Sequence, residues 1–417
     1  MVREWTGTPT GADRAALVRA FYERHPYPAP LDNLERHREL YRNPDRRRAL
    51  SLLLWPYEEP RSDREILIAG CGTSQAAIHA LREPDARVTA IDISEMSLNH
   101  TRELQKKYSL RNLEIHRLAI EEVGQLGRDF DQIVCTGVLH HLPDPALGLT
   151  SLRNVLKPEG AMQLMVYAAY GRSGIYMMQE YCRMLAIAPT PAALRDLSAT
   201  IGALSADHPI IGVTRRAMDF REPDTLADAL LHPQDRAYTV PQLYAWLDRC
   251  GLSFGRWFEQ AAYLPQCGAI ARMPHAAQLA SLAPRVQHAA VELLRGTMTK
   301  HNFIAYRDDR PGNSQPISFN GEVWRSYVPL RLPWTLCVRD RAPPGSTAVL
   351  VNRNHSYPDL ALPIDAVQER VYAAINGART VDEILRRAAG EGGEEKARRF
   401  FERLWDYDQI VFDAVAT

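Results

Sequence analysis

Lysine is scarce in this chain, and the positive and negative charges of the chain cancel. Only five of the 50 basic residues are lysines, so arginine supplies nearly all of the positive charge. The 50 acidic residues bring the formal net charge to zero, which leaves no overall basic field to attract nucleic acid or an anionic membrane. We therefore expect neither as a partner, and we attribute the arginine excess to codon bias rather than to arginine-based binding.

Cysteine patterns of the usual metal and redox kinds are also missing. None of the six cysteines forms a CxxC pair, which argues against zinc ribbons and thioredoxin-like redox motifs. The first residues lack a basic stretch followed by an apolar core, and the longest apolar runs are far shorter than a membrane span. These absences predict a cytoplasmic protein with reduced thiols, no secretory signal and no membrane association.

The composition is that of a soluble protein with two or three domains, since 46% of the 417 residues are apolar and 24% are charged. Residues 64–160 alternate strand patterns with helix patterns, which predicts a parallel α/β sheet with right-handed crossovers. The predicted strands are residues 65–69, 87–92, 113–117, 130–136 and 161–167. The predicted helices between them are residues 75–81, 96–108 and 146–156.

The remaining segments predict a division of the chain into four parts. Residues 171–235 have helical patterns and few strand signals, which indicates a helical insertion, and further strands are predicted at 253–259 and 301–306. Residues 308–316 are typical of a linker. We expect a helical cap or lid at 1–60, an α/β domain at 61–307, a β-rich segment at 317–362 and a small winged-helix-like module at 363–417.

The first predicted strand ends in Ala69-Gly70-Cys71-Gly72, and the second ends in an acid, Asp92. Glycine permits positive φ angles and close approach of a ligand to the backbone. A carboxylate at the end of the next strand can accept hydrogen bonds from both hydroxyls of a ribose. Alone, the glycines would indicate an ordinary turn and Asp92 an acid near a helix start. Together at this spacing they favour a nucleoside-binding site.

The turn departs from the fingerprint of dinucleotide-binding proteins. That fingerprint, GxGxxG, places a pyrophosphate at the start of a helix. The sixth position here is Gln75 instead of glycine or alanine. This departure weakens the interpretation of the turn as a pyrophosphate site.

The fourth predicted strand leads into a loop that contains two adjacent histidines, His140 and His141. A loop at the carboxyl end of a central strand faces the ligand crevice of an open α/β sheet. Neighbouring residues of a strand point to opposite faces, so we expect one histidine to line the crevice and the other to pack in the core. We predict no metal site from this pair.

Four segments together resemble the class I S-adenosylmethionine-dependent methyltransferases: residues 66–72, 88–92, 130–145 and 152–166. The resemblance covers residues 64–167 and matches in order and spacing. It implies a seven-stranded, Rossmann-like methyltransferase sheet whose last strand is antiparallel. It also implies S-adenosylmethionine as the cofactor and S-adenosylhomocysteine as the product.

The resemblance also implies roles for particular residues. Asp92 would bind the ribose, with Ile93 against the adenine. Thr136 and Gly137 would border the sulfonium, and the turn would lie against the methionine part of the cofactor, through Ala69, Gly70, Cys71 and Gly72. The loop after the third strand often carries an acid for the adenine amino group, but Ala119 and its neighbours are apolar. Whether Glu121 or a backbone group takes that part is open.

The N-terminal segment 21–30, which we call the strap, resembles a segment found before some bacterial methyltransferase domains. Its aromatic residues Tyr22 and Tyr27 could cover the cofactor, because an aromatic face attracts a cation by about 0.5–2 kcal/mol. They could equally pack the first helix onto the sheet. For a nucleophile that must lose a proton, the candidate groups are His140, His141 and Tyr22.

Three functions are consistent with these patterns. The first is methyl transfer to a peptide or protein side chain, or to a small molecule. The second is an NAD-dependent oxidoreductase, against which Gln75 counts. The third is a non-catalytic protein that uses the fold as a binding scaffold. The C-terminal residues faintly resemble peptide-binding modules but would serve equally as a dimerisation appendage, so a homodimer is also considered.

Overall fold

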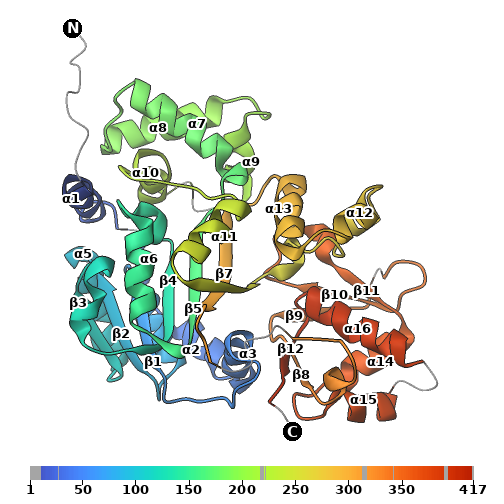
Figure 1. Ribbon diagram of the computed structural model, residues 1–417. Helices are drawn as coiled ribbons and strands as arrows, with labels where there is room; N and C mark the ends of the chain where they lie inside the picture. Colours follow the sequence, from blue (N-terminus) through green and yellow to red (C-terminus); the bar gives the residue numbers. More distant parts are fainter. Residues whose placement is uncertain are drawn as a thin grey trace. The chain divides into compact units, whose positions relative to one another are not determined.

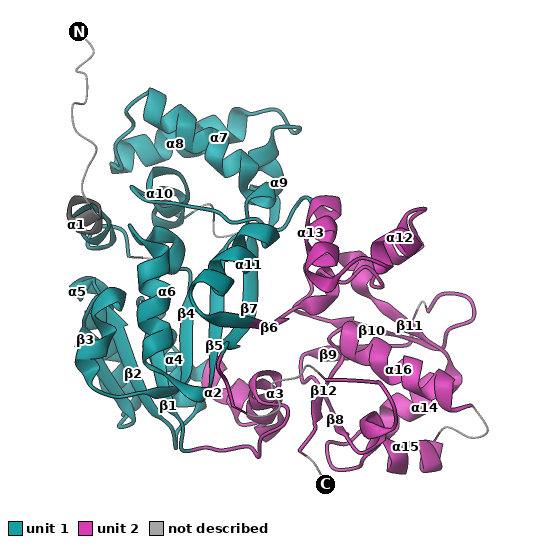
Figure 2. Ribbon diagram, in the orientation of Figure 1, with its two compact units in different colours: residues 1–35, 63–253, 296–308 teal, residues 36–62, 254–295, 309–417 magenta. Residues whose placement is uncertain are grey.

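The computed structural model describes residues 11–26, 28–216, 220, 222–311, 317–340, 342–388 and 393–415. The chain forms two compact units, coloured separately in Figure 2. Unit 1 comprises Met1–Glu35, Asp63–Ser253 and Gly296–Asp308, and unit 2 comprises Arg36–Ser62, Phe254–Arg295 and Asp309–Thr417. The four-part division that we expected from the sequence stays a prediction.

A seven-stranded sheet with the order β3-β2-β1-β4-β5-β7-β6 forms the main scaffold (Figure 1). Its strands are β1 (Glu65–Ala69), β2 (Arg87–Asp92), β3 (Leu113–Arg117), β4 (Phe130–Thr136), β5 (Leu156–Tyr167), β6 (Leu252–Trp257) and β7 (Lys300–Arg307). The first five pair in parallel, whereas β7 pairs antiparallel with β5. The predicted seven-stranded Rossmann-like sheet is therefore confirmed, and β1 to β4 have the predicted bounds.

The sheet is held by apolar residues that alternate along its strands. Ile66 and Ile68 of β1, together with Val88 and Ala90 of β2, belong to one buried cluster. Residues two apart on a strand share a face, so these side chains form a continuous apolar surface against which helices pack. Ala76 is one of the helical residues in this cluster.

The helices of unit 1 connect the strands and form the expected insertion. They are α1 (Gly11–Tyr22), α4 (Gln75–Arg82), α5 (Glu95–Tyr108), α6 (Pro145–Asn154), α7 (Ser173–Met184), α8 (Pro191–Ala203), α9 (Pro209–Arg216), α10 (Pro223–Leu231) and α11 (Val240–Arg249). The sequence did not predict α9, because it is short and rich in β-branched residues with low helix propensity. Burial of Ile210 and Val213 in the core of the insertion stabilises it.

The elements of unit 2 are α2 (Glu35–Tyr41), α3 (Pro44–Leu54), α12 (Ala276–Ala280), α13 (Pro284–Arg295), α14 (Ala366–Ala374), α15 (Val381–Ala388), α16 (Glu394–Asp406), β8 (Val328–Arg331), β9 (Thr335–Val338), β10 (Ala348–Asn352), β11 (Leu362–Ile364) and β12 (Ile410–Asp413). Residues 36–55 and 278–294 each have the sequence pattern of a single helix, but each of these segments forms two helices. The second helix of each pair begins with a proline, Pro44 or Pro284, because proline suits the first helical position and not the interior.

The C-terminal part of unit 2 contains the expected three helices and closing strand. The sequence pattern Thr380-Val381-Asp382-Glu383 is typical of a capping box, and the structure contains one: the Glu383 amide donates to Thr380 Oγ1 at 3.2 Å, and the Thr380 amide donates to Glu383 Oε2 at 2.9 Å. Gly377 has φ +75°, but it lies two residues beyond Ile375, the extended C-cap of α14, so it does not itself end the helix. The likeness to a winged helix stays a prediction. Among the described residues, no helix is long and apolar enough to cross a membrane.

Candidate active site

The carboxyl ends of β1, β2 and β4 carry the residues that the sequence singled out. The strands themselves are buried, but Gly70, Gly72, Asp92, Thr136 and Gly137 at their ends are each partly exposed. Ligands of open α/β sheets bind at this edge, where loops leave neighbouring strands. Ile93 and Ala119 follow β2 and β3 at the same edge and are also partly exposed, whereas Ala69 and Cys71 are buried.

The turn after β1 requires its glycines. Gly70 and Gly72 have φ angles of +70° and +54°, which side chains other than glycine rarely adopt. A Cβ atom at Gly70 would lie 2.4 Å from Cγ2 of Val138, which follows β4. The two loops therefore meet at a point where only a bare backbone fits, as a platform for a ligand requires.

Asp92 is joined directly to this turn. Its Oδ2 accepts a hydrogen bond from the Gly72 amide at 2.9 Å, and its Oδ1 accepts one from the Ser94 amide at 2.9 Å. A carboxylate has about four acceptor positions, so two stay available for the hydroxyls of a ribose. Burial raises the pKa of Asp92, and repulsion by Glu23 adds to this, whereas the amide hydrogen bonds oppose it.

Gln75 lies at the start of the helix that a pyrophosphate would approach. It is the first residue of α4, and its Nε2 donates a hydrogen bond to Thr136 Oγ1 at 2.8 Å. The side chain therefore bridges the start of α4 and the end of β4. A dinucleotide would need this helix start for its phosphates, so the arrangement favours a cofactor without a pyrophosphate.

The strap contacts the segments that follow β1 and β2, at the carboxyl edge of the sheet, in two places. Glu23 accepts hydrogen bonds from the amides of Glu95 at 2.8 Å and Met96 at 3.3 Å, the first two residues of α5. Its negative charge suits the start of a helix. Further along, the Pro28 carbonyl accepts a hydrogen bond from Thr73 Oγ1 at 2.9 Å. The strap is thus fixed to the glycine loop and to the helix that follows Asp92. Tyr27 lies outside the described residues.

Tyr22 points instead toward the helical insertion. Its hydroxyl donates to Asp228 Oδ1 of α10 at 3.1 Å, and the Tyr167 hydroxyl donates to Asp228 Oδ2 at 3.4 Å. Burial raises the pKa of Asp228, and it raises the pKa of Tyr22 well above its ordinary value. Tyr22 is therefore a protonated donor near neutral pH, which contradicts its expected part as a base.

His140 and His141 lie on a short 3-10 helix, η2 (Leu139–His141), and not on a strand. Our expectation that their side chains diverge is wrong, because their ring centroids are 4.2 Å apart. His140 packs against Tyr167, with centroids 3.8 Å apart, and burial lowers its pKa well below the usual value. His141 Nδ1 is 2.7 Å from the Gln234 carbonyl oxygen. Both histidines are buried.

The sequence did not single out three residues of this cluster, namely Asp228, His232 and Asp235. The ring of His232 lies 3.9 Å from that of His141, and burial lowers its pKa well below the usual value. Asp235 pairs with Arg172 at 3.3 Å. These residues come from the insertion, some 90 residues after β4. The only local signal for them is that two acids lie near a His-Pro pair in an otherwise apolar stretch, and this does not predict a site.

The arrangement at the sheet edge fits S-adenosylmethionine. Gly70 provides a backbone cradle that a Cβ atom would fill, Asp92 retains acceptor capacity, and Gln75 stands where the dinucleotide fingerprint has a glycine. Next to this edge lie phenols, neutral imidazoles and buried carboxylates, which can hold a nucleophile and accept its proton.

Comparison with known proteins supports this conclusion. A family model described as a methyltransferase domain matches residues 67–162. An uncharacterized protein from Synechococcus sp. is 32% identical over 254 residues, which cover 59% of this chain and 61% of that protein. A ubiquinone biosynthesis O-methyltransferase from Idiomarina loihiensis is 34% identical over 98 residues, 23% of this chain and 40% of that enzyme. The chain therefore spans less than two thirds of the length of these relatives.

The fold is also similar to that of PKMT2 from Rickettsia typhi. The TM-score is 0.60 at 13% identity, covering 89% of this chain and 75% of that one. The same protein in complex with AdoHcy gives a TM-score of 0.58 at 14% identity. At such low identity this likeness concerns the fold. Taken together, these matches show that residues 67–162 are similar to a methyltransferase domain and that the fold around them is similar to that of a known structure, PKMT2.

Proposed function

We propose that this protein transfers the methyl group of S-adenosylmethionine to a nucleophile of an acceptor. The observation that carries this proposal is the hydrogen bond between Asp92 and the Gly72 amide, which joins a ribose-binding acid to a bare backbone platform. Asp92 would hold the ribose, with Ile93 and Ala119 beside the adenine. The turn would hold the methionine part, with Thr136 and Gly137 beside the sulfonium.

Methyl transfer is an in-line displacement, so the protein contributes mainly by bringing the reactants together in the correct orientation, an effect worth several kcal/mol. The strap would help to orient the cofactor, because Glu23 holds it to the start of α5, after Asp92, and Pro28 holds it to Thr73 of the glycine loop. Tyr22 belongs to the same segment, and its hydroxyl bonds to Asp228 of the insertion. Cofactor and acceptor would therefore meet between the sheet edge and α10.

A nucleophile that carries a proton needs a group to accept it, and we assign this part to Asp228. Its carboxylate is buried, and burial raises its pKa, which makes it a better base than an exposed aspartate. The phenols of Tyr22 and Tyr167 would orient it, one at each oxygen. His140 and His141, which we first considered as bases, lie beside this group.

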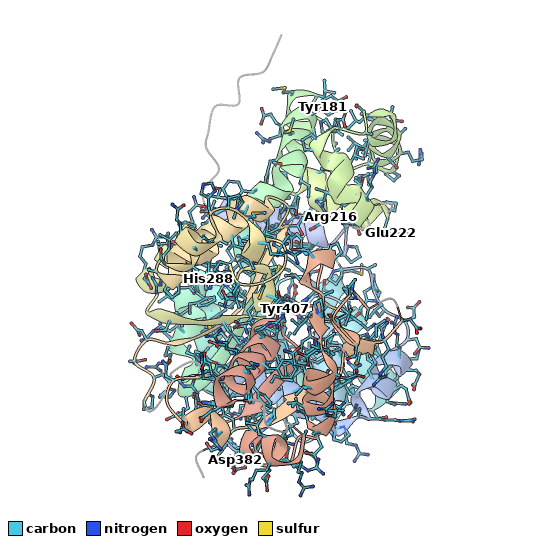
Figure 3. All side chains as sticks on the ribbon, turned by 90° about the vertical axis from the view of Figure 1, so that its right-hand side faces the viewer. Tyr181, Arg216, Glu222, His288, Asp382 and Tyr407 are labelled. Carbon is cyan, nitrogen blue, oxygen red and sulfur yellow. The ribbon has the colours of Figure 1, made fainter. Side chains whose placement is uncertain are left out.

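The acceptor would be a peptide or protein side chain, or a small molecule. The insertion favours the larger class, because α7 and the residue that follows it expose several apolar side chains, one of which, Tyr181, is labelled in Figure 3. These exposed residues are Met177, Tyr181, Met184 and Leu185. Such a set suits a peptide chain, and it suits a second copy in a homodimer equally well.

Incubation of the protein with S-adenosylmethionine labelled in its methyl group, in an extract of cells that lack the protein, tests this proposal. We expect label in the polypeptide fraction or in the small-molecule fraction, and none with Asp92→Ala. Asp196→Asn, an exposed residue of α8, serves as the control and should leave the transfer intact. Absence of label from both fractions, despite cofactor binding, would favour a binding scaffold. NAD-dependent reduction by the same extract would favour an oxidoreductase, against which Gln75 already counts.

A further inference from the structure

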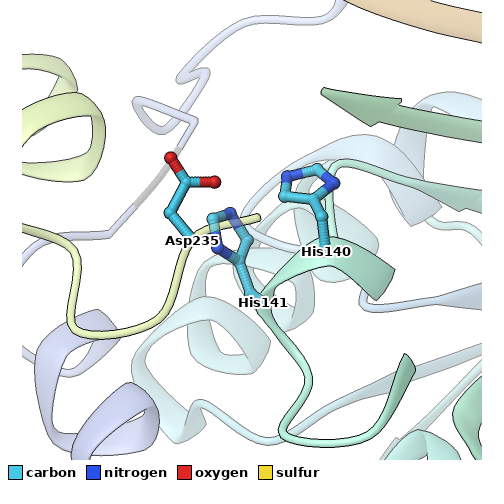
Figure 4. Close-up of side chains that lie close together, drawn as sticks. All are labelled: His140, His141 and Asp235. Atoms are coloured by element: carbon cyan, nitrogen blue, oxygen red, sulfur yellow. The ribbon is translucent and has the colours of Figure 1, made fainter. Parts of the chain in front are cut away.

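Three side chains near the carboxyl edge of the sheet are close enough together to bind one ion: His140, His141 and Asp235. One possible ligand atom of each lies within 4.8 Å of those of the other two. The histidines come from η2 and the aspartate from the loop after α10, and Figure 4 shows the three side chains gathered there. We propose that these three residues bind a divalent transition-metal ion.

The strongest support is a set of buried polar atoms that lack partners. Neither ring nitrogen of His140 has a hydrogen-bond partner among the described residues, and the residue is 0% exposed. Oδ1 of Asp235 is likewise buried without a partner. A buried polar atom left unpaired costs about 1–3 kcal/mol. An ion between these residues would satisfy one nitrogen of His140 and this carboxylate oxygen at once.

The hydrogen bond of His141 prepares its ring for a metal. Its Nδ1 lies 2.7 Å from the carbonyl oxygen of Gln234, to which only a protonated nitrogen can bond, so Nδ1 donates. In the neutral ring this leaves the lone pair on Nε2. Metal-binding histidines usually donate their other N–H group to a carbonyl or carboxylate in this way, which fixes the tautomer and the ring orientation.

Hydrogen bonds also fix the second carboxylate oxygen of Asp235. Its Oδ2 accepts hydrogen bonds from Arg172 at 3.3 Å and from Gln179 Nε2 at 2.9 Å. These contacts position the carboxylate and leave Oδ1 for an ion. Arg172 balances only one of the two buried carboxylates, Asp228 and Asp235, so the cluster retains negative charge that a cation would neutralise.

The set of ligands indicates the kind of ion. Two imidazoles and one carboxylate suit Zn²⁺, Fe²⁺, Co²⁺ or Ni²⁺, whereas Mg²⁺ and Ca²⁺ prefer oxygen ligands alone. Three protein ligands leave at least one coordination position open. If the proposed methyl transfer is correct, the acceptor heteroatom could bind at that position and lose its proton more easily. This role rests on the proposed function, but the binding of the ion does not.

A second set of residues, His141, Asp228 and His232, also brings ligand atoms within 4.8 Å of one another. It is the poorer site for an ion. Both oxygens of Asp228 already accept hydrogen bonds from phenols, and His232 Nδ1 accepts one from the Gln234 amide at 3.0 Å. With Nδ1 as an acceptor, the proton of neutral His232 is on Nε2, which prevents that nitrogen from binding a metal.

Titration of the chelator-treated full-length protein with Co²⁺ tests the inference without any need for activity. We expect one equivalent to bind, with the visible absorption of Co²⁺ in a site of nitrogen and oxygen ligands, and one equivalent of Zn²⁺ to displace it. Asp235→Asn and His141→Asn should each weaken binding by at least tenfold. His275→Gln removes an exposed histidine of unit 2 and should leave binding unchanged.

Two results would overturn the inference: no saturable binding of Co²⁺ or Zn²⁺ by the wild-type protein, or binding that His275→Gln weakens while Asp235→Asn and His141→Asn do not. The thermal midpoint and the affinity for S-adenosylhomocysteine, measured for each variant, show whether it is folded. Because the wild-type titration needs no variant, it decides the matter even if a variant fails to fold. Metal binding without cofactor binding would support this inference and count against the proposed function.

Discussion

At the scale of single residues, burial determines which side chains around Asp228 hold a proton and which are neutral. It keeps Tyr22 protonated by raising its pKa, and it keeps His140 and His232 neutral by lowering theirs. Asp228 lies among them and receives a hydrogen bond at each oxygen. The same buried surroundings therefore produce proton donors, neutral rings and a proton acceptor within one cluster.

Replacement of Gly70 by alanine tests the backbone platform. The positive φ angle costs about 1–2 kcal/mol for a residue with a side chain, and the new Cβ would press against Val138. We expect a lower thermal midpoint and at least tenfold weaker binding of S-adenosylhomocysteine by calorimetry. Gly124→Ala is the matched control, because a Cβ atom there meets nothing within 4 Å. Equal affinities for the two variants would contradict the role of Gly70.

Replacement of Asp228 by asparagine tests the proton acceptor. Since burial raises the pKa of Asp228 above 3.8, the carboxylate takes up a proton at a higher pH than a free aspartate does, and kcat should fall as the pH decreases through that raised value. Asp228→Asn should lower kcat by roughly 100-fold or more and remove this acidic limb. The Kd for S-adenosylmethionine should change by less than about threefold, since Asp228 lies at the acceptor end. A wild-type pH profile in the variant would exclude Asp228 as the base.

The sequence revealed one half of the site better than the other for a physical reason. Gly70, Gly72 and Asp92 lie at the ends of adjacent strands, so their spacing along the chain reports their spacing in space. Asp228 and Asp235 reach the same edge only after the insertion has packed, and nothing local marks them. Tertiary packing, which a local pattern does not record, determines that half.

At the scale of secondary structure, the strap and α5 depend on each other. The amides of Glu95 and Met96 bond to Glu23, while the Ser97 amide donates to Ser94 Oγ at 3.2 Å. With the Ser94 amide, which donates to Asp92 Oδ1, all four amides at the start of this helix that lack an intrahelical partner are satisfied, two of them from the strap. Because α5 follows Asp92 closely, order in the strap supports the position of Asp92, the acid that we propose binds the ribose.

Glu23→Ala should loosen the strap. Loss of a cap of this kind costs about 1 kcal/mol. The Leu31 amide, which donates to Ser74 Oγ at 3.1 Å just after the strap, should then exchange its hydrogen faster, and cofactor affinity should fall by about threefold to tenfold. Hydrogen exchange followed by mass spectrometry measures the first effect. Glu39→Ala, an exposed residue of α2, is the control, and unchanged exchange in Glu23→Ala would refute the coupling.

Strands were predicted more accurately than helices. The apolar run of residues 66–69 in β1 stops at a glycine turn, and β2 stops at Asp92 before the helix cap Ser94, so the ends of these strands are visible in the sequence. The apolar periodicity of residues 36–55 and 278–294 continues through Pro44 and Pro284 and conceals the breaks there. Helix ends depend on caps and on proline at the first position, which periodicity alone does not show.

At the scale of the whole molecule, unit 2 contains its own buried polar network. Asp408 pairs with Arg256 at 2.9 Å and with His355 at 3.1 Å, and all three side chains are less than 10% exposed. Nearby in sequence, Asp406 accepts a hydrogen bond from Gln266 at 2.9 Å, and burial raises its pKa to about 7. Unit 2 thus holds a carboxyl group that is costly to ionise.

Asp406→Asn should therefore stabilise unit 2 in a pH-dependent manner. Between about pH 4 and pH 7 the folded state holds a proton that the unfolded state has lost, so this carboxyl group lowers stability as the pH rises through that window. The neutral amide avoids the cost and keeps an oxygen for Gln266. We expect a higher thermal midpoint than wild type at about pH 8 and an equal one at about pH 4. Asp340→Asn, an exposed residue of unit 2, should show no such trend. A midpoint difference that does not depend on pH would contradict this assignment.

The central claim is that the edge formed by Gly70, Gly72 and Asp92 binds S-adenosylmethionine. Isothermal titration calorimetry with S-adenosylmethionine, S-adenosylhomocysteine and NAD tests it most directly. We predict micromolar binding of the first two, no binding of NAD, and a loss of at least about 100-fold in affinity with Asp92→Ala, since its carboxylate would make charge-assisted hydrogen bonds to two hydroxyls. Tight binding of NAD without a response to S-adenosylmethionine, or unchanged affinity in Asp92→Ala, would contradict it.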